Sequence, residues 1–357
     1  MSGDRAAGSN EDPDLVPTGG ARGAVRHPGG HRVRSKEGWV LIETMTGEPS
    51  VILEDGRVRK FGHTNRTRIA GSANVAAQLD EVLRQVRGAA HPVRRQIRLA
   101  SSLPLQIVGV PVVGPYDQVY AIQLWVGRAD AAMPPRLPIG TLSLNPRTGI
   151  AHGCEISRKT ENPEITGTSV LPRLLTQLDG CDDRAGLLGL MSAPVGRRWI
   201  GTATSVGPIR RHLCIAARCC ASAAGPIVRI IVCDITEVQP PAPMSLDIGV
   251  LRKMPVPAGH AAGLVDLRSG LVHEWIALGP PPLDRWLTEI PQIYPDDAAE
   301  LQRCRNALIG GATSEMCLFR VRFGDDKPWS RVEAHWVAVP CDDAPQALLD
   351  VTLHEPG

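Results

Sequence analysis

Aromatic residues are scarce in this chain: they make up 4% of 357 residues, with three Phe and three Tyr beside seven Trp. No run of about 18 apolar residues and no signal-peptide pattern occurs, which argues against a membrane-spanning helix and predicts a cytoplasmic protein. The formal net charge is only +2, so no broad electrostatic field would draw the protein to nucleic acid or to a membrane surface.

Sequence motifs of common enzymes are also missing. We find no G-x-S-x-G, no P-loop, no G-x-G-x-x-G after a strand and no H-E-x-x-H. The nine cysteines are odd in number and form no C-x-x-C pair, which predicts reduced, buried thiols. The Gly/Leu-rich stretch from Gly186 to Gly196 has no Lys-Ser/Thr after its glycines, so we interpret it as core helix and turn. The sequence thus predicts a non-enzymatic protein with no catalytic residue.

What the chain does have is a globular composition with many turns. Hydrophobic residues make up 43%, charged residues 21%, and there are 31 Pro and 36 Gly. The length favours two or three domains. Residues 1–36 are Gly-rich, acidic at first and basic later, so we predict a disordered tail. The basic end leaves a nucleic-acid arm conceivable, but without aromatic residues between the charges a solvated tail is favoured.

The clearest strand pattern lies between Ser314 and Glu355. Polar and apolar residues alternate from Glu315 to Phe323 and again from Trp329 to Val339, and a third run follows Pro345. Period-two spacing broken by Gly, Asp and Pro clusters is typical of antiparallel strands joined by tight turns. We therefore predict a three-stranded meander, with shorter versions upstream.

The first predicted unit spans residues 37–128. It contains a hairpin from Ser50 to Phe61 with Asp55-Gly56 at its turn, then a helix from Ala73 to Arg87. Ser72 can cap the start of this helix and Gly88 its end. The apolar residues of the helix fall on one stripe: Val75, Leu79, Val82, Leu83 and Val86. Strands at 95–99, 105–113 and 118–126 would form its meander.

Two more units follow, at residues 139–237 and 258–355, separated by Pro-rich linkers at 128–138 and 238–257. Each is predicted to contain a hairpin, short helices and a meander. Helices are expected in the second unit, marked by Leu171, Leu174, Leu175 and Leu178, and in the third unit at Pro282–Ile290 and from Pro295 to Leu308. Asp234-Ile235-Thr236 and Asp350-Val351-Thr352 close their units 350 − 234 = 116 residues apart, a spacing that indicates tandem domains. The predicted fold class is α+β, with each domain an antiparallel five-stranded sheet and helices on one face.

The third unit resembles a PAS domain. Tyr294-Pro295-Asp296-Asp297 is similar to the entry of a PAS helix, and residues 315–339 follow the usual course of the later PAS strands. Asp325-Asp326 stands where the family usually has Asp-Gly. The second unit shares the Asp-Ile-Thr exit, and the first is PAS-like or GAF-like. The whole chain resembles actinobacterial tandem PAS/GAF-like sensory proteins without an effector domain.

This resemblance implies that flavin, haem and metal sites need consideration. Cys304 lies in a helix, but no Phe-Leu follows it as in flavin-adduct domains. His212, His273 and His335 lie on predicted strands, where a structural or solvent-facing role is favoured over haem ligation. His152 and Cys154 would share a strand face but lack a third zinc ligand. For Asp296-Asp297 we favour helix capping over acid/base work. We therefore predict no cofactor and no metal; ligand-binding residues stay unknown.

The favoured hypothesis is a cytoplasmic, non-enzymatic sensory protein that binds a small ligand or a signalling partner through its PAS/GAF-like modules and acts in trans. The alternative is a scaffold whose domain cores are filled and whose edge strands and exposed Trp side chains contact partner proteins. The sequence leaves open which domain would bind a ligand, which partner lies downstream and whether the protein forms a homodimer.

Overall fold

The structure, a computed structural model, describes residues 38–98, 104–154, 167–241, 243, 250, 253–325, 327–340 and 344–354, with only the backbone of Cys154. The tail predicted at residues 1–36 lies outside these residues, as do Asp326 and part of the second predicted linker.

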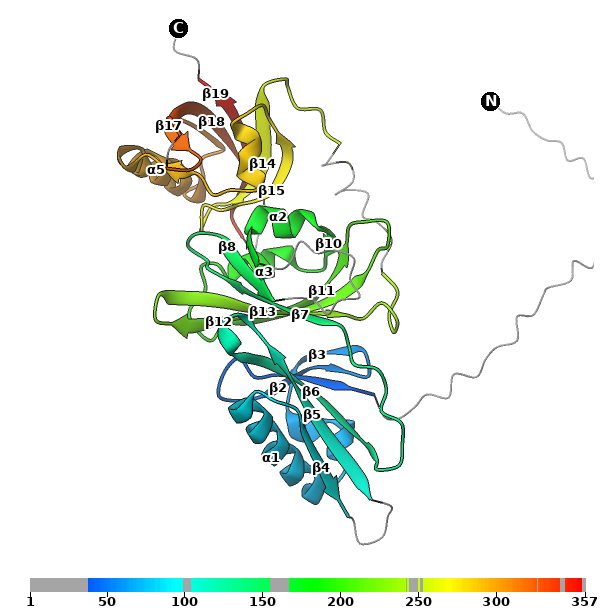
Figure 1. Ribbon diagram of the computed structural model, residues 1–357. Helices are drawn as coiled ribbons and strands as arrows, with labels where there is room; N and C mark the ends of the chain where they lie inside the picture. The colour runs from blue at the N-terminus through cyan, green and yellow to red at the C-terminus, as the bar shows by residue number, and fades with distance from the viewer. Residues whose placement is uncertain are drawn as a thin grey trace, which may run out of the picture. The chain divides into compact units, whose positions relative to one another are not determined.

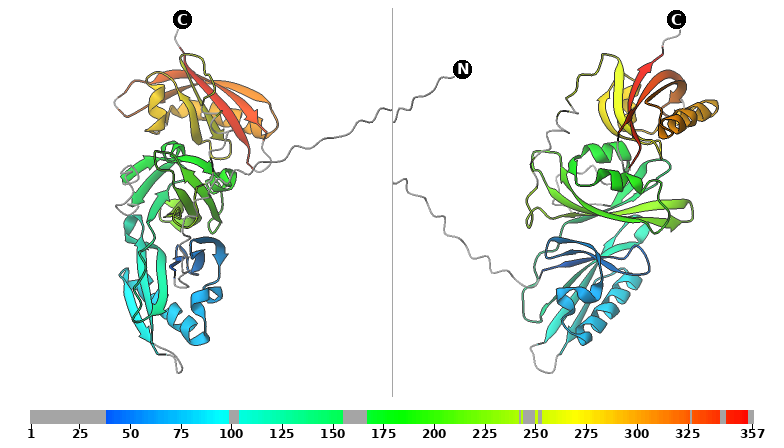
Figure 2. Two further views of the ribbon diagram at one scale, coloured as in Figure 1. Left: turned by 90° about the vertical axis from the view of Figure 1, so that its right-hand side faces the viewer. Right: turned by 180° about the vertical axis from the view of Figure 1, so that it is seen from behind.

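Three antiparallel sheets with few, short helices account for the described residues (Figure 1; Figure 2 shows them from two further directions). The first sheet has six strands: β1 Val40–Glu43, β2 Ser50–Glu54, β3 Arg57–Gly62, β4 Val93–Ile97, β5 Leu105–Val113 and β6 Val119–Arg128. The second has seven: β7 Ile139–Leu144, β8 Ile150–Cys154, β9 Gly167–Val170, β10 Leu178–Cys181, β11 Arg198–Ser205, β12 His212–Ser222 and β13 Gly225–Asp234. The third has six: β14 His260–Asp266, β15 Val272–Leu278, β16 Gln292–Ile293, β17 Ser314–Arg322, β18 Ser330–Val339 and β19 Gln346–Leu353.

One strand order recurs in all three sheets. Read from the opening hairpin, the orders are β3-β2-β1-β6-β5-β4, β9-β8-β7-β13-β12-β11-β10 and β15-β14-β19-β18-β17-β16. In each, the opening hairpin lies beside the last strand of the closing meander, so the sheet is completed by a contact between the two ends of the unit. This recurrence confirms the antiparallel α+β class. The predicted count of five strands is too low, because short edge strands such as β3, β9, β10 and β16 extend the sheets.

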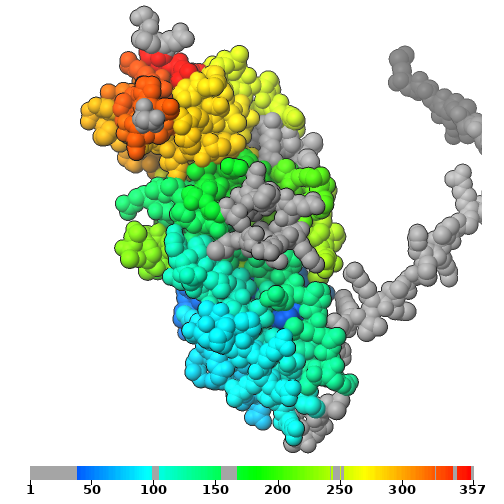
Figure 3. Space-filling model, in the orientation of Figure 1, coloured from blue at the N-terminus to red at the C-terminus, as the bar shows by residue number. Residues whose placement is uncertain are grey.

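The first sheet confirms most of the local predictions. Asp55 and Gly56 adopt positive φ at the β2–β3 turn, as the Asp-Gly pair predicts. Helix α1 (Ala73–Ala89) begins at Ser72, whose hydroxyl accepts a hydrogen bond from the Val75 amide, and its five stripe residues are all buried. It ends beyond the predicted Gly88, because Ala90 adopts the left-handed conformation that closes it. One side of α1 is exposed, as are alternate residues of β4; Figure 3 shows this region of the first sheet at the surface.

The helices of the other two sheets are short. Helices α2 (Leu171–Thr176) and α3 (Arg184–Gly189) lie against one face of the second sheet (Figure 1). The third sheet is accompanied by α5 (Ala298–Ile309), and the helix predicted at Pro282–Ile290 is a single 3-10 turn, Leu283–Leu287. Asp297 stands at the predicted N-cap position of α5 but makes no side-chain capping hydrogen bond; its carboxylate accepts hydrogen bonds from the Arg320 side chain at 2.8 and 2.9 Å instead.

The central strands of the first and second sheets are buried on both faces. The face of the first sheet opposite α1 shares a core with the face of the second sheet opposite α2, in which Leu41, Tyr120 and Ala121 pack with Cys214, Ala216 and Ile231. A buried ion pair between Glu43 and Arg218 lies at the same junction. Both faces therefore demand apolar residues, which explains why strands such as β2 and β7 are buried at every position.

Candidate ligand-binding site

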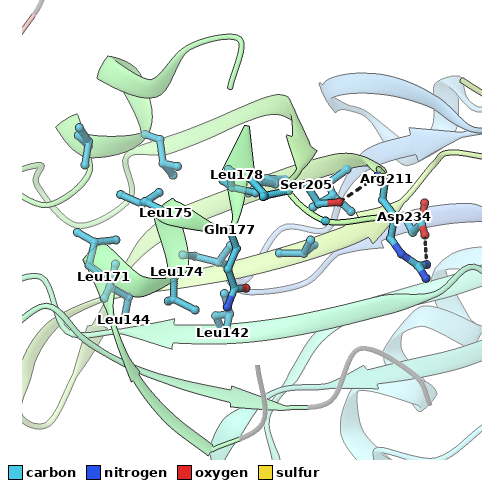
Figure 4. Close-up of a pocket in the computed structure, with 18 of the residues that line it drawn as sticks. Leu142, Leu144, Leu171, Leu174, Leu175, Gln177, Leu178, Ser205, Arg211 and Asp234 are labelled. Carbon is cyan, nitrogen blue, oxygen red and sulfur yellow. Dashed lines mark hydrogen bonds and ion pairs between the residues drawn. The ribbon is translucent and has the colours of Figure 1, made fainter. Parts of the chain in front are cut away.

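The second sheet carries an apolar pocket on the face covered by α2 and α3. Its volume is about 350 Å³. The floor comes from alternate residues of the three central strands β7, β12 and β13. Residues paired across neighbouring strands point to the same face of the sheet, and Ile230 pairs with Leu142 while Val232 pairs with Ile215. The walls come from leucines of α2 and α3 and from Met191. Figure 4 shows the leucines gathered at one side of this space.

The pocket edge is formed by the loop between β11 and β12. This loop is closed by hydrogen bonds from the Ser205 amide to the Arg211 carbonyl (2.9 Å) and from the Arg211 amide to the Ser205 hydroxyl (3.0 Å). The Val206 amide donates to the carbonyl of Gln177 at 2.8 Å, which ties the loop to the end of α2. Val206 and Ile209 are about half exposed, at 46% and 59%, so the pocket has an apolar edge that solvent can reach.

Polar side chains gather at the end of the pocket away from the leucines (Figure 4). Arg211 donates from Nη1 to Oδ2 of Asp234 at 2.7 Å, and Oδ1 of Asp234 accepts from the amide and hydroxyl of Thr236 at 2.9 and 2.6 Å. Burial raises the pKa of Asp234, but the hydrogen bonds from Thr236 and Arg211 outweigh it, so the pKa lies below its usual value and the carboxylate is charged.

Two polar side chains of the lining have hydrogen-bonding capacity to spare. A guanidinium carries five N–H groups, and with the described residues the Arg211 side chain makes only the bond to Asp234. The Gln177 amide makes no side-chain hydrogen bond with the described residues, and it lies on the leucine side of the pocket, beside Leu142 and Leu174 (Figure 4). The pocket therefore combines a long aliphatic part with a small set of polar groups, the usual composition of a small-ligand site.

The histidines that the sequence singled out for cofactor or metal binding are not brought together, and the Cys154 side chain lies outside the described residues. Nδ1 of His212 lies 3.2 Å from the Gln239 carbonyl, His152 lies 3.2 Å from the Thr168 hydroxyl, and His335 is exposed on β18. His273 is buried, and neither ring nitrogen has a hydrogen-bond partner among the described residues. Within those residues, no group of three or more His, Cys, Asp or Glu could hold a metal ion.

Cys304 is buried in α5 beside Cys317 of β17. Burial raises the pKa of both thiols, that of Cys317 to about 12, so they are protonated at neutral pH and are poor nucleophiles. This environment is that of core thiols.

The sequence prediction named none of the pocket residues as a site. Leu171, Leu174, Leu175 and Leu178 were identified as a helix stripe, and Leu187 and Leu188 as core, whereas all six line the pocket. No local sequence pattern marked the cavity, because it depends on how much of a seven-stranded sheet two six-residue helices cover.

Three comparisons bear on the fold. Residues 38–135 match the family model described as Rv3651-like, N-terminal. The crystal structure of an uncharacterised protein from Mycobacterium tuberculosis matches with a TM-score of 0.70 at 19% identity, over 89% of this chain and 96% of that one. This likeness establishes a shared fold along nearly the whole chain. No curated protein matches.

Two sensory proteins match much more loosely. They are an RNA-binding light-oxygen-voltage receptor, with a TM-score of 0.23 at 11% identity over 61% of this chain and 95% of that one, and a methyl-accepting chemotaxis protein X, with a TM-score of 0.21 at 13% identity over 61% and 75%. Superpositions at these scores carry no weight for fold or function. As for membranes, none of the helices in the described part of the chain combines the length and the apolar character needed to cross one.

Proposed function

We propose that the protein is a non-enzymatic sensor built from tandem PAS/GAF-like modules, and that it binds a small ligand in the pocket of its second sheet. The supporting observation is the pocket itself: an aliphatic cavity of about 350 Å³ with a few convergent polar groups at one end. This volume falls in the lower part of the range of small-molecule sites.

The connection from the pocket to the end of its unit supports a sensory role. Asp234 is bound by Arg211 on the pocket side and by Thr236 on the other, and Thr236 in turn accepts a hydrogen bond from the His212 amide at 2.8 Å. A ligand that changes the Arg211–Asp234 contact therefore acts directly on the Asp-Ile-Thr segment, where the second unit ends. Such a coupling requires that the ligand favour one arrangement of this segment over the other.

Thermal denaturation with a broad panel of metabolites and cofactors tests the proposal. A compound that binds only the folded protein raises its stability by about 2.7 kcal/mol at a concentration one hundred times its Kd. Leu175→Phe places a larger side chain in the pocket wall and should abolish the response. Leu318→Phe makes the same change at an exposed position of β17 and should preserve it. If no compound shifts the transition of the unmodified protein, the proposal is wrong.

A second candidate function, protein binding through the third sheet, has its own observation. The core of this sheet is filled by Trp275, Trp286, Phe323 and Trp336, while Met316, Leu318 and Val337 are exposed on its other face. Exposed Trp side chains do not contribute as the scaffold hypothesis expected, because six of the seven tryptophans are buried and Trp329 is half-buried. Pull-down of a defined partner that is lost on Met316→Asp but retained on Leu175→Phe would favour this function.

A further inference from the structure

We propose that the ligand of the second-sheet pocket is a single aliphatic chain of about ten heavy atoms that ends in a hydrogen-bond-accepting oxygen. This inference rests on the proposed function and specifies its ligand. It follows from three features of the pocket: what lines the cavity, what stands at its polar end, and how much volume it encloses.

The lining favours an aliphatic ligand over a planar aromatic one. Seventeen of the 21 lining residues are Leu, Ile, Val, Met, Pro or Gly, and none is Phe, Tyr or Trp. Ring systems such as flavins usually gain from stacking on aromatic faces, and this pocket offers none among its lining residues. Unbranched alkyl chains need only apolar contact area, which the leucines of α2 and α3 supply on one side and β7 and β13 supply on the other.

The polar end selects an acceptor rather than a cation. Four lining residues are polar, Gln177, Ser205, Arg211 and Asp234, and the largest free capacity among them is that of the Arg211 N–H groups that make no bond with the described residues. Asp234 is already bonded to Arg211 and Thr236, and the Ser205 hydroxyl already accepts from the Arg211 amide. The remaining N–H groups of Arg211 can bond a carboxylate or a carbonyl oxygen, and the Gln177 amide offers a further donor and acceptor nearer the leucines. A quaternary ammonium group has no N–H to donate, and Asp234, the one anion of the lining, is already neutralised by Arg211.

The volume sets the length of the chain. A cavity of about 350 Å³ lies near the lower end of the range of small-molecule sites, which suits a chain of about ten heavy atoms better than a larger ligand. The half-exposed Val206 and Ile209 at the edge extend this apolar path toward solvent, where the head group of the ligand or its last carbons would lie.

Isothermal titration calorimetry with single-chain probes below their micellar concentrations tests this inference on the full chain. We expect decanoate and its neutral analogue decanamide to bind and decyltrimethylammonium to bind at least about tenfold more weakly. The affinity should fall about fourfold for each methylene removed between decanoate and hexanoate, because each loses one buried CH₂ group. Comparison of decanoate with decanamide tells whether the natural head group is anionic or neutral.

Variants locate the binding. Gln177→Glu replaces a neutral amide with an anion of nearly the same shape and should weaken decanoate binding at least about tenfold. Gln302→Glu makes the same charge change on the exposed side of α5 and should leave decanoate binding unaltered. Leu175→Phe should abolish binding of every probe while the protein stays folded, which circular dichroism would show.

Three outcomes would overturn the inference: no binding of decanoate, an affinity independent of chain length, or equal binding of the cationic probe. These outcomes can be distinguished from failure of the proposed function. If another compound of the panel stabilises the unmodified protein but not Leu175→Phe, the pocket is a ligand site and only its ligand class is wrong. If nothing stabilises the protein, both proposals fall.

Discussion

His273 is buried on β15 beside Glu274, whose carboxylate is bonded to Arg184 at 2.7 Å. Burial lowers the pKa of His273 to about 3, and the positive charge of Arg184 acts in the same direction. The imidazole is therefore neutral in the folded protein above about pH 4.

The pKa of His273 predicts a specific acid sensitivity. The unfolded chain takes up a proton on this residue near pH 6.5, whereas the folded chain does so only near pH 3, so stability falls as the pH is lowered between these values. His273→Leu should remove this part of the pH dependence. Urea denaturation at pH 7.5, 6, 5 and 4 would measure it, and an unaltered slope in the variant would contradict the buried, neutral assignment.

At the scale of elements, helix α1 shows which features of a helix the local sequence determines. Its start at Ser72, its five-residue apolar stripe and its preceding Asp-Gly hairpin all follow from the sequence, because each depends on residues within one or two turns of the chain. Its end does not: Ala90 closes it in a conformation that is unusual for alanine, two residues beyond the glycine that suits this role better.

The N-cap of α1 gives a test at this scale. Ser72→Ala removes the acceptor for the Val75 amide and should destabilise the protein by about 1 kcal/mol. Ser72→Asp retains an acceptor and serves as the control. Hydrogen exchange of the first amides of α1 would report the change directly; equal protection in Ser72→Ala and the unmodified protein would show that the cap contributes nothing.

At the scale of the whole molecule, the shared core between the first and second sheets links their stability. Ile231 of β13 is fully buried in this core, together with residues of β1, β2 and β6. Phe319 of β17 lies instead in the separate core of the third sheet. The two positions therefore belong to different packing units of the chain.

Truncation at these two positions should lower hydrogen-exchange protection in different sets of strands. Ile231→Ala is expected to cost about 2 to 5 kcal/mol and to lower hydrogen-exchange protection in β5 and β6 as well as in β12 and β13. Phe319→Ala should cost a similar amount but lower protection in β17 to β19 only. Loss of protection confined to the second sheet in Ile231→Ala would mean that the first sheet is stable by itself.

By itself the sequence determined the main strands, helix α1, the hairpin turns and the repetition of one α+β pattern, because each is set by spacing and turn chemistry over a few residues. The short edge strands β9, β10 and β16 were missed, because they depend on pairing with a neighbouring strand. Only the tertiary structure decided which faces are doubly buried and where a cavity remains. Leu171, Leu187 and Ile230 have the same chemistry whether they fill a core or line a pocket, and the difference depends on how completely two short helices cover the face of a sheet. That coverage is a property of residues distant in sequence, so no local pattern records it.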